Sequence, residues 1–239
     1  MSAAPWPLFS HAFQPIVDLG SGETRSWEAL VRGSDGSPAS AVLSAVSEEH
    51  LYRFDEVCRA SSVELAARLA LPGCLNLNFL PRGLEARPET LDHTLGVAKE
   101  AGLGPERLVL EVSETELVAD PMRFAERMNE VRGRGVQVAI DDFGAGYSGL
   151  NLLASFQPDQ VKLDMLLARG IEGHGPRQAI VRGVMQVCMD LGIEVIVEGV
   201  ETADEFAWFR DAGVELFQGY FLARPSFEAI VPAPLDQPK

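Results

Sequence analysis

Residues 12 to 33 read AFQPIVDLGSGETRSWEALVRG, and this stretch decides the fold. It contains two apolar, β-rich runs, residues 12–19 and 26–33, separated by only six residues, Gly20 to Arg25. Parallel strands need a crossover of a dozen or more residues, usually a helix, and the connection here is too short for one. The two runs are therefore predicted to pair as an antiparallel hairpin.

Six further apolar runs follow, and segments with helical periodicity alternate with them. The runs are 74–80, 107–114, 137–143, 160–165, 194–200 and 216–222. The segment after Pro176 repeats apolar residues at a spacing typical of a helix packed against a sheet. Its predicted inner face consists of Ile180, Val184, Val187, Cys188 and Leu191. Eight strands alternating with helices predict an α/β fold, namely a modified (β/α)8 TIM-like barrel with an antiparallel first strand.

The length and charge of the chain fit one enzyme-sized domain. We expect residues 1–11 to form an N-terminal extension, 12–230 the barrel and 231–239 a C-terminal tail. The 35 acidic and 20 basic residues give a net charge of −15, which argues against binding to DNA or to an anionic membrane surface. The sequence shows no membrane-spanning stretch and no signal peptide, so a cytoplasmic protein is expected.

Carboxylates recur within or at the ends of four of the apolar runs. They are Glu28, Glu111, Asp141, Asp142 and Glu198. Singly, any of them is as well explained as the N-cap or first-turn charge of a following helix. In a parallel barrel, however, the carboxyl ends of the strands meet at one rim, and five carboxylates there repel each other unless cations neutralise them. Oxygen ligands, with Asn76 as a further candidate, favour Mg²⁺ or Mn²⁺ over zinc.

Two motifs at the end of the run 137–143 suggest other functions, and both are rejected. The loop GAGYSG, residues 144–149, matches a dinucleotide-binding fingerprint, but a pyrophosphate there would face the carboxylates of Asp141 and Asp142. Residues 142–144 spell the DFG motif of protein kinases, but the chain has no HRD segment and no glycine-rich loop near its N-terminus. The glycines are better explained by a tight βα loop.

Eight motifs, in order along roughly residues 12 to 228, resemble the EAL domain of cyclic di-GMP phosphodiesterases. They are QPIV (14–17), EALVR (28–32), Asn76, EVSE (111–114), DDFGAGYSGL (141–150), VKLD (161–164), EGVE (198–201) and QGY (218–220). The barrel of this family has an antiparallel first strand. The resemblance implies that two Mg²⁺ or Mn²⁺ ions assist the hydrolysis of one phosphodiester bond of cyclic di-GMP to linear pGpG, and that Ca²⁺ inhibits it.

The resemblance also implies a role for each matching residue. The first metal ion would be held by Glu28, Asn76, Glu111 and Asp141, and the second by Asp141, Asp142 and Glu198. Lys162 would position or assist the attacking water, and Gln218 would orient it. Contacts to the substrate fall to Gln14, the backbone near Leu30, Arg32 and Asp164. Glu114 and Glu201 would hold the loop after Asp142 in its working shape.

Plainer explanations exist for several of these residues. Lys162 could be a structural cation that neutralises the acidic rim, Gln218 a strand-end amide, and Arg32 a surface residue. Two other functions also remain open. One is a non-catalytic cyclic di-GMP receptor or protein-interaction domain, and the other is a metal phosphodiesterase for a different nucleotide. The retained metal ligands and Lys162 favour the enzyme.

The same resemblance implies a homodimer formed through the loop after Asp142 and the helix that follows. The apolar residues of that helix are Leu150, Leu152, Leu153 and Phe156. For Leu150 and Leu153, packing on the chain's own core is at least as good an explanation. A sensory or regulatory domain in a separate chain is a further possible partner.

Overall fold

The computed structural model describes residues 5–87, 89–114, 121–146 and 149–234. The strands are β1 (Phe9–Asp18), β2 (Glu23–Gly33), β3 (Cys74–Asn78), β4 (Leu108–Ser113), β5 (Gln137–Phe143), β6 (Gln160–Leu163), β7 (Glu194–Val197), β8 (Leu216–Phe217) and β9 (Ser226–Phe227). The α-helices are α1 (Ala39–Leu43), α2 (Leu51–Arg68), α3 (Gly83–Ala86), α4 (Thr90–Glu100), α5 (Pro121–Arg132), α6 (Gly149–Ser155), α7 (Met165–Ala168), α8 (Gly175–Leu191) and α9 (Ala203–Asp211). Short 3₁₀ turns are Glu48–His50, Pro105–Arg107 and Ile171–Gly173.

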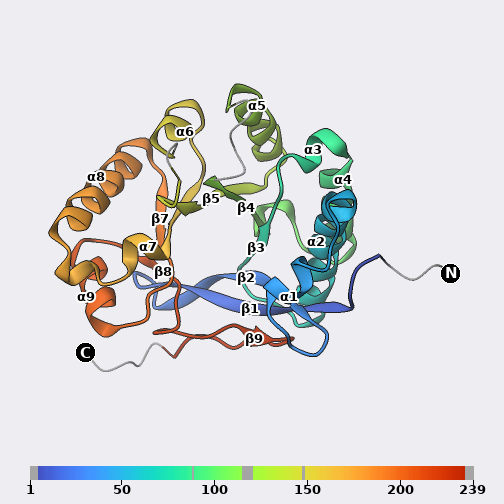
Figure 1. The fold of residues 1–239 in the computed structure, drawn as a ribbon, viewed down its shortest axis with the longest axis horizontal. Coiled ribbons are helices and arrows are strands. Elements are labelled where there is room, and N and C mark those ends of the chain that lie inside the picture. The colour runs from blue at the N-terminus through green and yellow to red at the C-terminus, as the bar shows by residue number, and fades with distance from the viewer. Residues whose placement is uncertain (1–4, 88, 115–120, 147–148, 235–239) are drawn as a thin grey trace.

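The strands close into a barrel with helices around its outside (Figure 1). Strands β2 to β8 follow one another in parallel, and β1 completes the ring by pairing antiparallel with both β2 and β8. The hairpin turn between β1 and β2 is stabilised by Asp18, whose Oδ1 accepts hydrogen bonds from the backbone N–H groups of Gly20 and Ser21. The predicted barrel with an antiparallel first strand is confirmed.

The ends of the barrel differ in detail from the prediction. Strand β1 begins at Phe9, within the expected N-terminal extension, and β9 is a short additional strand that pairs with β1. Strand β8 ends at Phe217, whereas the apolar run extends to residue 222. The chain turns at Gly219, where an added Cβ would lie 2.1 Å from the carbonyl oxygen of Val200. Only glycine permits so close an approach, and the turn ends the strand.

Two apolar layers hold the barrel together. The larger lies between the strands and the surrounding helices and includes Phe13, Trp27 and Leu75. The smaller is inside the barrel and consists of Ile16, Ile196 and Leu216. Because side chains alternate along a strand, each of these three residues shares a face with the polar residue two positions away, toward the candidate site. These three residues form an apolar layer inside the barrel, below the polar side chains of the candidate site.

Helix α8 packs on the barrel with a face that matches the predicted one only at Val184 and Cys188. Its buried residues are Val181, Val184 and Cys188, whereas Ile180, Val187 and Leu191 are 57%, 37% and 42% exposed. The sequence contains two neighbouring apolar stripes on this helix, and periodicity alone does not tell which of them faces the sheet. Among the described residues, no helix has both the length and the apolar character that a membrane crossing requires.

Two valines on α8 test the corrected helix face. We expect Val181→Ala to lower the free energy of unfolding by about 2 kcal/mol, because the side chain is fully buried and its truncation leaves a cavity. The matched change Val187→Ala should stay within about 0.5 kcal/mol, as surface substitutions usually do. Urea titration followed by circular dichroism measures both. Equal losses, or a larger loss at Val187, would contradict this placement of the helix.

Candidate metal centre

The strands bring the predicted site residues to one rim of the barrel. Each of the eight barrel strands contributes. Strand β5 supplies two neighbouring residues, and every other strand supplies one, either within the strand or directly after its end. The residues are Gln14 on β1, Glu28 on β2, Asn76 on β3, Glu111 on β4, Asp141 and Asp142 on β5, Lys162 on β6, Glu198 after β7 and Gln218 after β8. Strand β1 runs antiparallel to β2, and its register places Gln14 directly opposite Glu28, at the same rim.

Lys162 occupies the centre of this rim. Its side chain is fully buried, and its Nζ lies 2.8 Å from Glu111 Oε1 and 2.5 Å from Glu198 Oε1. Asp141 Oδ1 and Glu28 Oε2 are 3.2 and 3.4 Å away. One ammonium group therefore interacts with four carboxylates that come from four different strands or strand ends. It offsets part of their mutual repulsion.

Side-chain amides fix the orientation of two of these carboxylates. Asn76 Nδ2 donates to Glu111 Oε1 over 2.8 Å, and Gln218 Nε2 donates to Glu28 Oε2 over 2.7 Å. Asn78, two residues after Asn76 on the same face of β3, donates to the other oxygen of Glu28 over 3.2 Å. No role was predicted for Asn78, although residues two apart on a strand share a face and Asn76 was a predicted ligand.

The end of β5 departs from regular strand geometry. Asp142 has a φ of 55°, in the left-handed region that residues other than glycine rarely adopt, and the pairing of β5 with β6 shifts register here. The turn brings neighbouring carboxylates together, because oxygen atoms of Asp141, Asp142 and Glu198 all lie within 4.8 Å of one another. In a regular strand, Asp141 and Asp142 would point to opposite faces.

The protonation of these groups reflects their burial and their crowding. Burial, only partly offset by Lys162, raises the pKa of Glu111 and of Glu198 above the usual range. Burial and the charge of Asp141 raise the pKa of Asp142 to about 6. Burial opposes the charge of Lys162, but the surrounding carboxylates outweigh it and hold its pKa well above the ordinary value. Any divalent cation that binds here will displace protons.

The donor set fits a hard divalent cation. Within the described part of the chain, Asn76 Oδ1 and Glu111 Oε2 are buried and have no hydrogen-bond partner. Asp141 Oδ1 also lacks an aligned hydrogen bond, although it lies near Lys162. Buried oxygen atoms left without donors are costly unless something coordinates them. All the available ligands are oxygens, which Mg²⁺ and Mn²⁺ prefer.

A cleft of about 360 Å³ lies beside the acidic rim. Its walls include the expected Gln14 and Gln218, and also Met165, Arg169 and Tyr220, for which the sequence predicted no role. No motif marked Arg169, which reaches the cleft from the segment after α7. Arg32 and Leu30 do not line this cleft. On β2, Leu30 and Arg32 lie two and four residues beyond Glu28 on the same face. The Arg32 guanidinium donates to the carbonyl oxygen of Val31.

Asp164 caps a helix and also lines the cleft. Its side chain caps α7 by accepting a hydrogen bond from the backbone N–H of Leu166 over 2.8 Å. The cap leaves the carboxylate at the edge of the cleft, where a ligand can reach it. The N-cap role that could explain any single carboxylate at a strand end is thus observed at Asp164.

The two glutamates expected to hold the loop after Asp142 take different positions. Glu114 Oε2 accepts hydrogen bonds from the backbone N–H groups of Gly144 and Gly146, at 2.9 and 3.2 Å. Glu201 instead pairs with Arg169 at 2.7 Å, on the other side of the cleft. Its expected contact with the loop therefore stays a prediction. Residues 147–148 of the loop lie outside the described residues.

Comparison with known proteins agrees with this geometry. The family model of the EAL domain matches residues 8–225, which is most of the chain. The chain belongs to the EAL domain family. The blue light- and temperature-regulated antirepressor BluF of Escherichia coli is 34% identical over 92% of this chain and 55% of its own length. The cyclic di-GMP phosphodiesterase NbdA of Pseudomonas aeruginosa is 30% identical over 89% of this chain and 28% of its own length.

Solved EAL structures share the fold closely. A standalone EAL protein from Vibrio cholerae with cyclic di-GMP bound superposes with a TM-score of 0.90 at 41% identity, covering 98% of both chains. BlrP1 of Klebsiella pneumoniae, in complex with manganese and cyclic di-GMP, gives 0.90 at 38% identity over 98% of this chain and 59% of its own. The present chain thus spans about half the length, or less, of the curated relatives it matches.

Proposed function

We propose that this EAL domain is a metal-dependent phosphodiesterase that hydrolyses cyclic di-GMP to linear pGpG. One observation carries the proposal: the oxygen ligands for two metal ions converge around Lys162, and several of the buried oxygens lack a hydrogen-bond partner among the described residues. The support from relatives is consistent, because BlrP1 binds manganese together with cyclic di-GMP, and NbdA is named as a phosphodiesterase for that nucleotide.

The residues of the rim would divide the work as follows. Glu28, Asn76, Glu111 and Asp141 would hold one ion, and Asp141, Asp142 and Glu198 the other. When bound, the ions would supply Lewis acidity at the scissile phosphate and lower the pKa of a water. The surrounding carboxylates hold the pKa of Lys162 well above its ordinary value. Lys162 would position or assist the water and add positive charge at the phosphate. Gln218 Oε1 has no hydrogen-bond partner among the described residues and would orient the attacking water.

Binding of the substrate would use the neighbouring residues. Gln14 is anchored by a hydrogen bond from its Nε2 to the carbonyl oxygen of Ala223, which leaves its position above the cleft fixed. Asp164 lies at the cleft edge. Arg32 and the Leu30 backbone lie farther along β2, where they could contact a phosphate and sugar that extend beyond the cleft.

A second candidate function is a receptor or protein-binding domain without catalysis. One relative favours it, since BluF, at 34% identity, is named as an antirepressor. A receptor needs to bind the nucleotide but does not need a metal site that places a water. The intact ligand set favours the hydrolase, and product analysis separates the two.

Nucleotide chromatography after incubation with cyclic di-GMP tests the proposal. With Mg²⁺ or Mn²⁺ we expect pGpG to accumulate, and with EDTA or Ca²⁺ we expect it not to. Ca²⁺ takes more ligands at longer distances, which would displace the water from its attacking position. Glu198→Gln should lower the rate at least about 100-fold, because it removes a charged ligand and keeps the shape of the side chain.

If no pGpG forms, a measurement of cyclic di-GMP binding distinguishes the remaining explanations. Cyclic di-GMP that stays intact with Mn²⁺ at high enzyme concentration, but binds in calorimetry, would leave only the receptor. Intact nucleotide without binding would contradict both functions and favour a different substrate.

We further propose a homodimer that uses the start of α6. Leu150 is 59% exposed there, whereas Leu152, Leu153 and Phe156 are buried in the chain's own core. Of the four apolar residues, only Leu150 is therefore free to contact a partner. Glu114 holds the adjoining loop, which would link the interface to Asp142.

Sedimentation velocity tests this interface. Leu150→Arg should convert a dimer to a monomer, because it places a charge in an apolar contact. Leu43→Arg is the matched control, since Leu43 is exposed on α1 and away from α6. A parent chain that sediments as a monomer, or a Leu150→Arg variant that stays dimeric, would contradict the proposal.

A further inference from the structure

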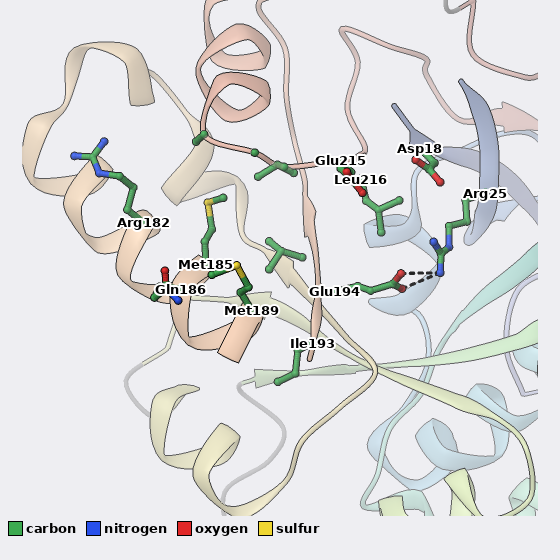
Figure 2. A pocket seen from close by; sticks show the side chains of 14 residues that line it. Asp18, Arg25, Arg182, Met185, Gln186, Met189, Ile193, Glu194, Glu215 and Leu216 are labelled. Carbon is green, nitrogen blue, oxygen red and sulfur yellow. Dashed lines mark hydrogen bonds and ion pairs between the residues drawn. The ribbon is translucent and has the colours of Figure 1, made fainter. Parts of the chain in front are cut away.

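Figure 2 shows a second cavity, which is lined by residues at the amino ends of β7 and β8. The metal centre lies at the carboxyl ends of these strands. The volume of the cavity is about 600 Å³. It is formed by α8, the turn after α9, the first residues of β7 and β8, and residues of the β1–β2 hairpin. Leu216 lines it and also belongs to the interior layer with Ile16 and Ile196. That apolar layer separates the cavity from the acidic rim.

One half of the cavity is apolar. Met185 and Met189 lie one turn apart on α8, and Ile193, Val214 and Leu216 continue the same wall. Met189 is 67% exposed, so apolar surface here is uncovered in the folded chain. Methionine side chains are flexible and polarisable, which suits them to apolar ligands of irregular shape.

The other half is acidic. Figure 2 shows Asp18, Arg25, Glu194 and Glu215 together on the side away from α8. The charge of Arg25 is matched by Glu194 at 2.8 Å. Within the described part of the chain, the Asp18 carboxylate accepts hydrogen bonds only from backbone N–H groups, and no interaction of the Glu215 side chain is found. Two carboxylates on this side thus have no cationic partner there.

The remaining charges of the cavity reinforce this polarity. Helices α8 and α9 both end at it, and helix C-termini carry a partial negative charge. The second arginine of the lining, Arg182, lies at the far side of α8 in Figure 2, with its guanidinium 5.8 Å from the centre of the Trp208 ring. It therefore does not neutralise Asp18 or Glu215.

We propose that this cavity binds a small organic cation with an apolar body. The apolar part would cover Met185, Met189 and Ile193, and the cationic group would face Asp18 and Glu215. The volume is within the range of small-molecule sites. The same charges disfavour an anionic ligand, so the site does not take the nucleotide proposed for the rim. The bound cation would contact the amino ends of β7 and β8. Glu198 and Gln218 of the metal centre follow the carboxyl ends of the same two strands.

Methionine methyl resonances locate binding directly. The chain labelled with ¹³C-methyl methionine is titrated, with saturating Mg²⁺, against three probes with one apolar body: 4-phenylbutylammonium, 4-phenylbutanol and 5-phenylpentanoate. Met185 and Met189 report on the cavity, Met165 on the cleft beside the rim and Met128 on the core. Single Met→Leu variants assign the signals. We expect the ammonium probe to shift the Met185 and Met189 signals at the lowest concentration, the alcohol to bind more weakly and the carboxylate not to bind.

A charge variant tests the acidic half. Glu215→Gln should weaken binding of the ammonium probe about two- to fivefold, as expected for one exposed charge, and leave binding of the alcohol unchanged. Glu100→Gln, an exposed position on α4, is the matched control for net charge and should change neither. Shifts at Met165 alone, no shift at the solubility limit of the probe, equal binding of the carboxylate, or no effect of Glu215→Gln would each overturn the proposal.

Discussion

The interaction on which the site depends is the contact of one buried ammonium with four carboxylates. Parallel strands bring Glu28, Glu111 and Asp141 to one rim, and Glu198 follows from the end of β7. Their repulsion in a buried environment would oppose folding if nothing offset it. Lys162 on β6 lies among all four, at 2.5 to 3.4 Å. It offsets only part of the charge, and this remaining imbalance makes the rim a place for divalent cations.

The same constraint explains the polar neighbours of the rim. Asn76, Asn78 and Gln218 each donate a hydrogen bond to a carboxylate, so they orient it without adding charge. Asp142 reaches the site through a left-handed backbone conformation, and such strain is typical of functional positions. Below the rim, Ile16, Ile196 and Leu216 form an apolar layer inside the barrel. The hydrogen bonds from the amides restrict the orientation of the carboxylates, which is what placement of metal ions and of a phosphate requires.

Much of the fold could be predicted from the sequence, because its signals are local. The six-residue connection between the first two runs required a hairpin, and the alternation of apolar runs and helical segments required a barrel. Other features depend on tertiary packing. Strand β9 is two residues long, and the buried face of α8 was one of two adjacent apolar stripes. Neither can be decided from periodicity.

The candidate site followed from the sequence to a similar degree. Carboxylates at strand ends are a pattern, and the barrel topology places them together. The partners of individual side chains do not follow from such a pattern. Glu201 pairs with Arg169, which reaches the cleft from the segment after α7 and belongs to no motif of the sequence. The turn at Asp142 and the role of Asn78 likewise depend on distances that only the folded chain defines.

The free energy of unfolding of Lys162→Met, measured in EDTA and in Mg²⁺, tests most directly whether the carboxylates depend on cations. In EDTA at neutral pH, we predict a loss of about 3–5 kcal/mol relative to the parent, the usual result of removing one partner of a buried ion pair. Lys99→Met, at an exposed lysine on α4, should lose almost nothing. Mg²⁺ should stabilise the parent and Lys162→Met, because it binds only the folded rim. Parent-like stability of Lys162→Met in EDTA, together with no effect of Mg²⁺ on either chain, would contradict the central role of cations at this rim.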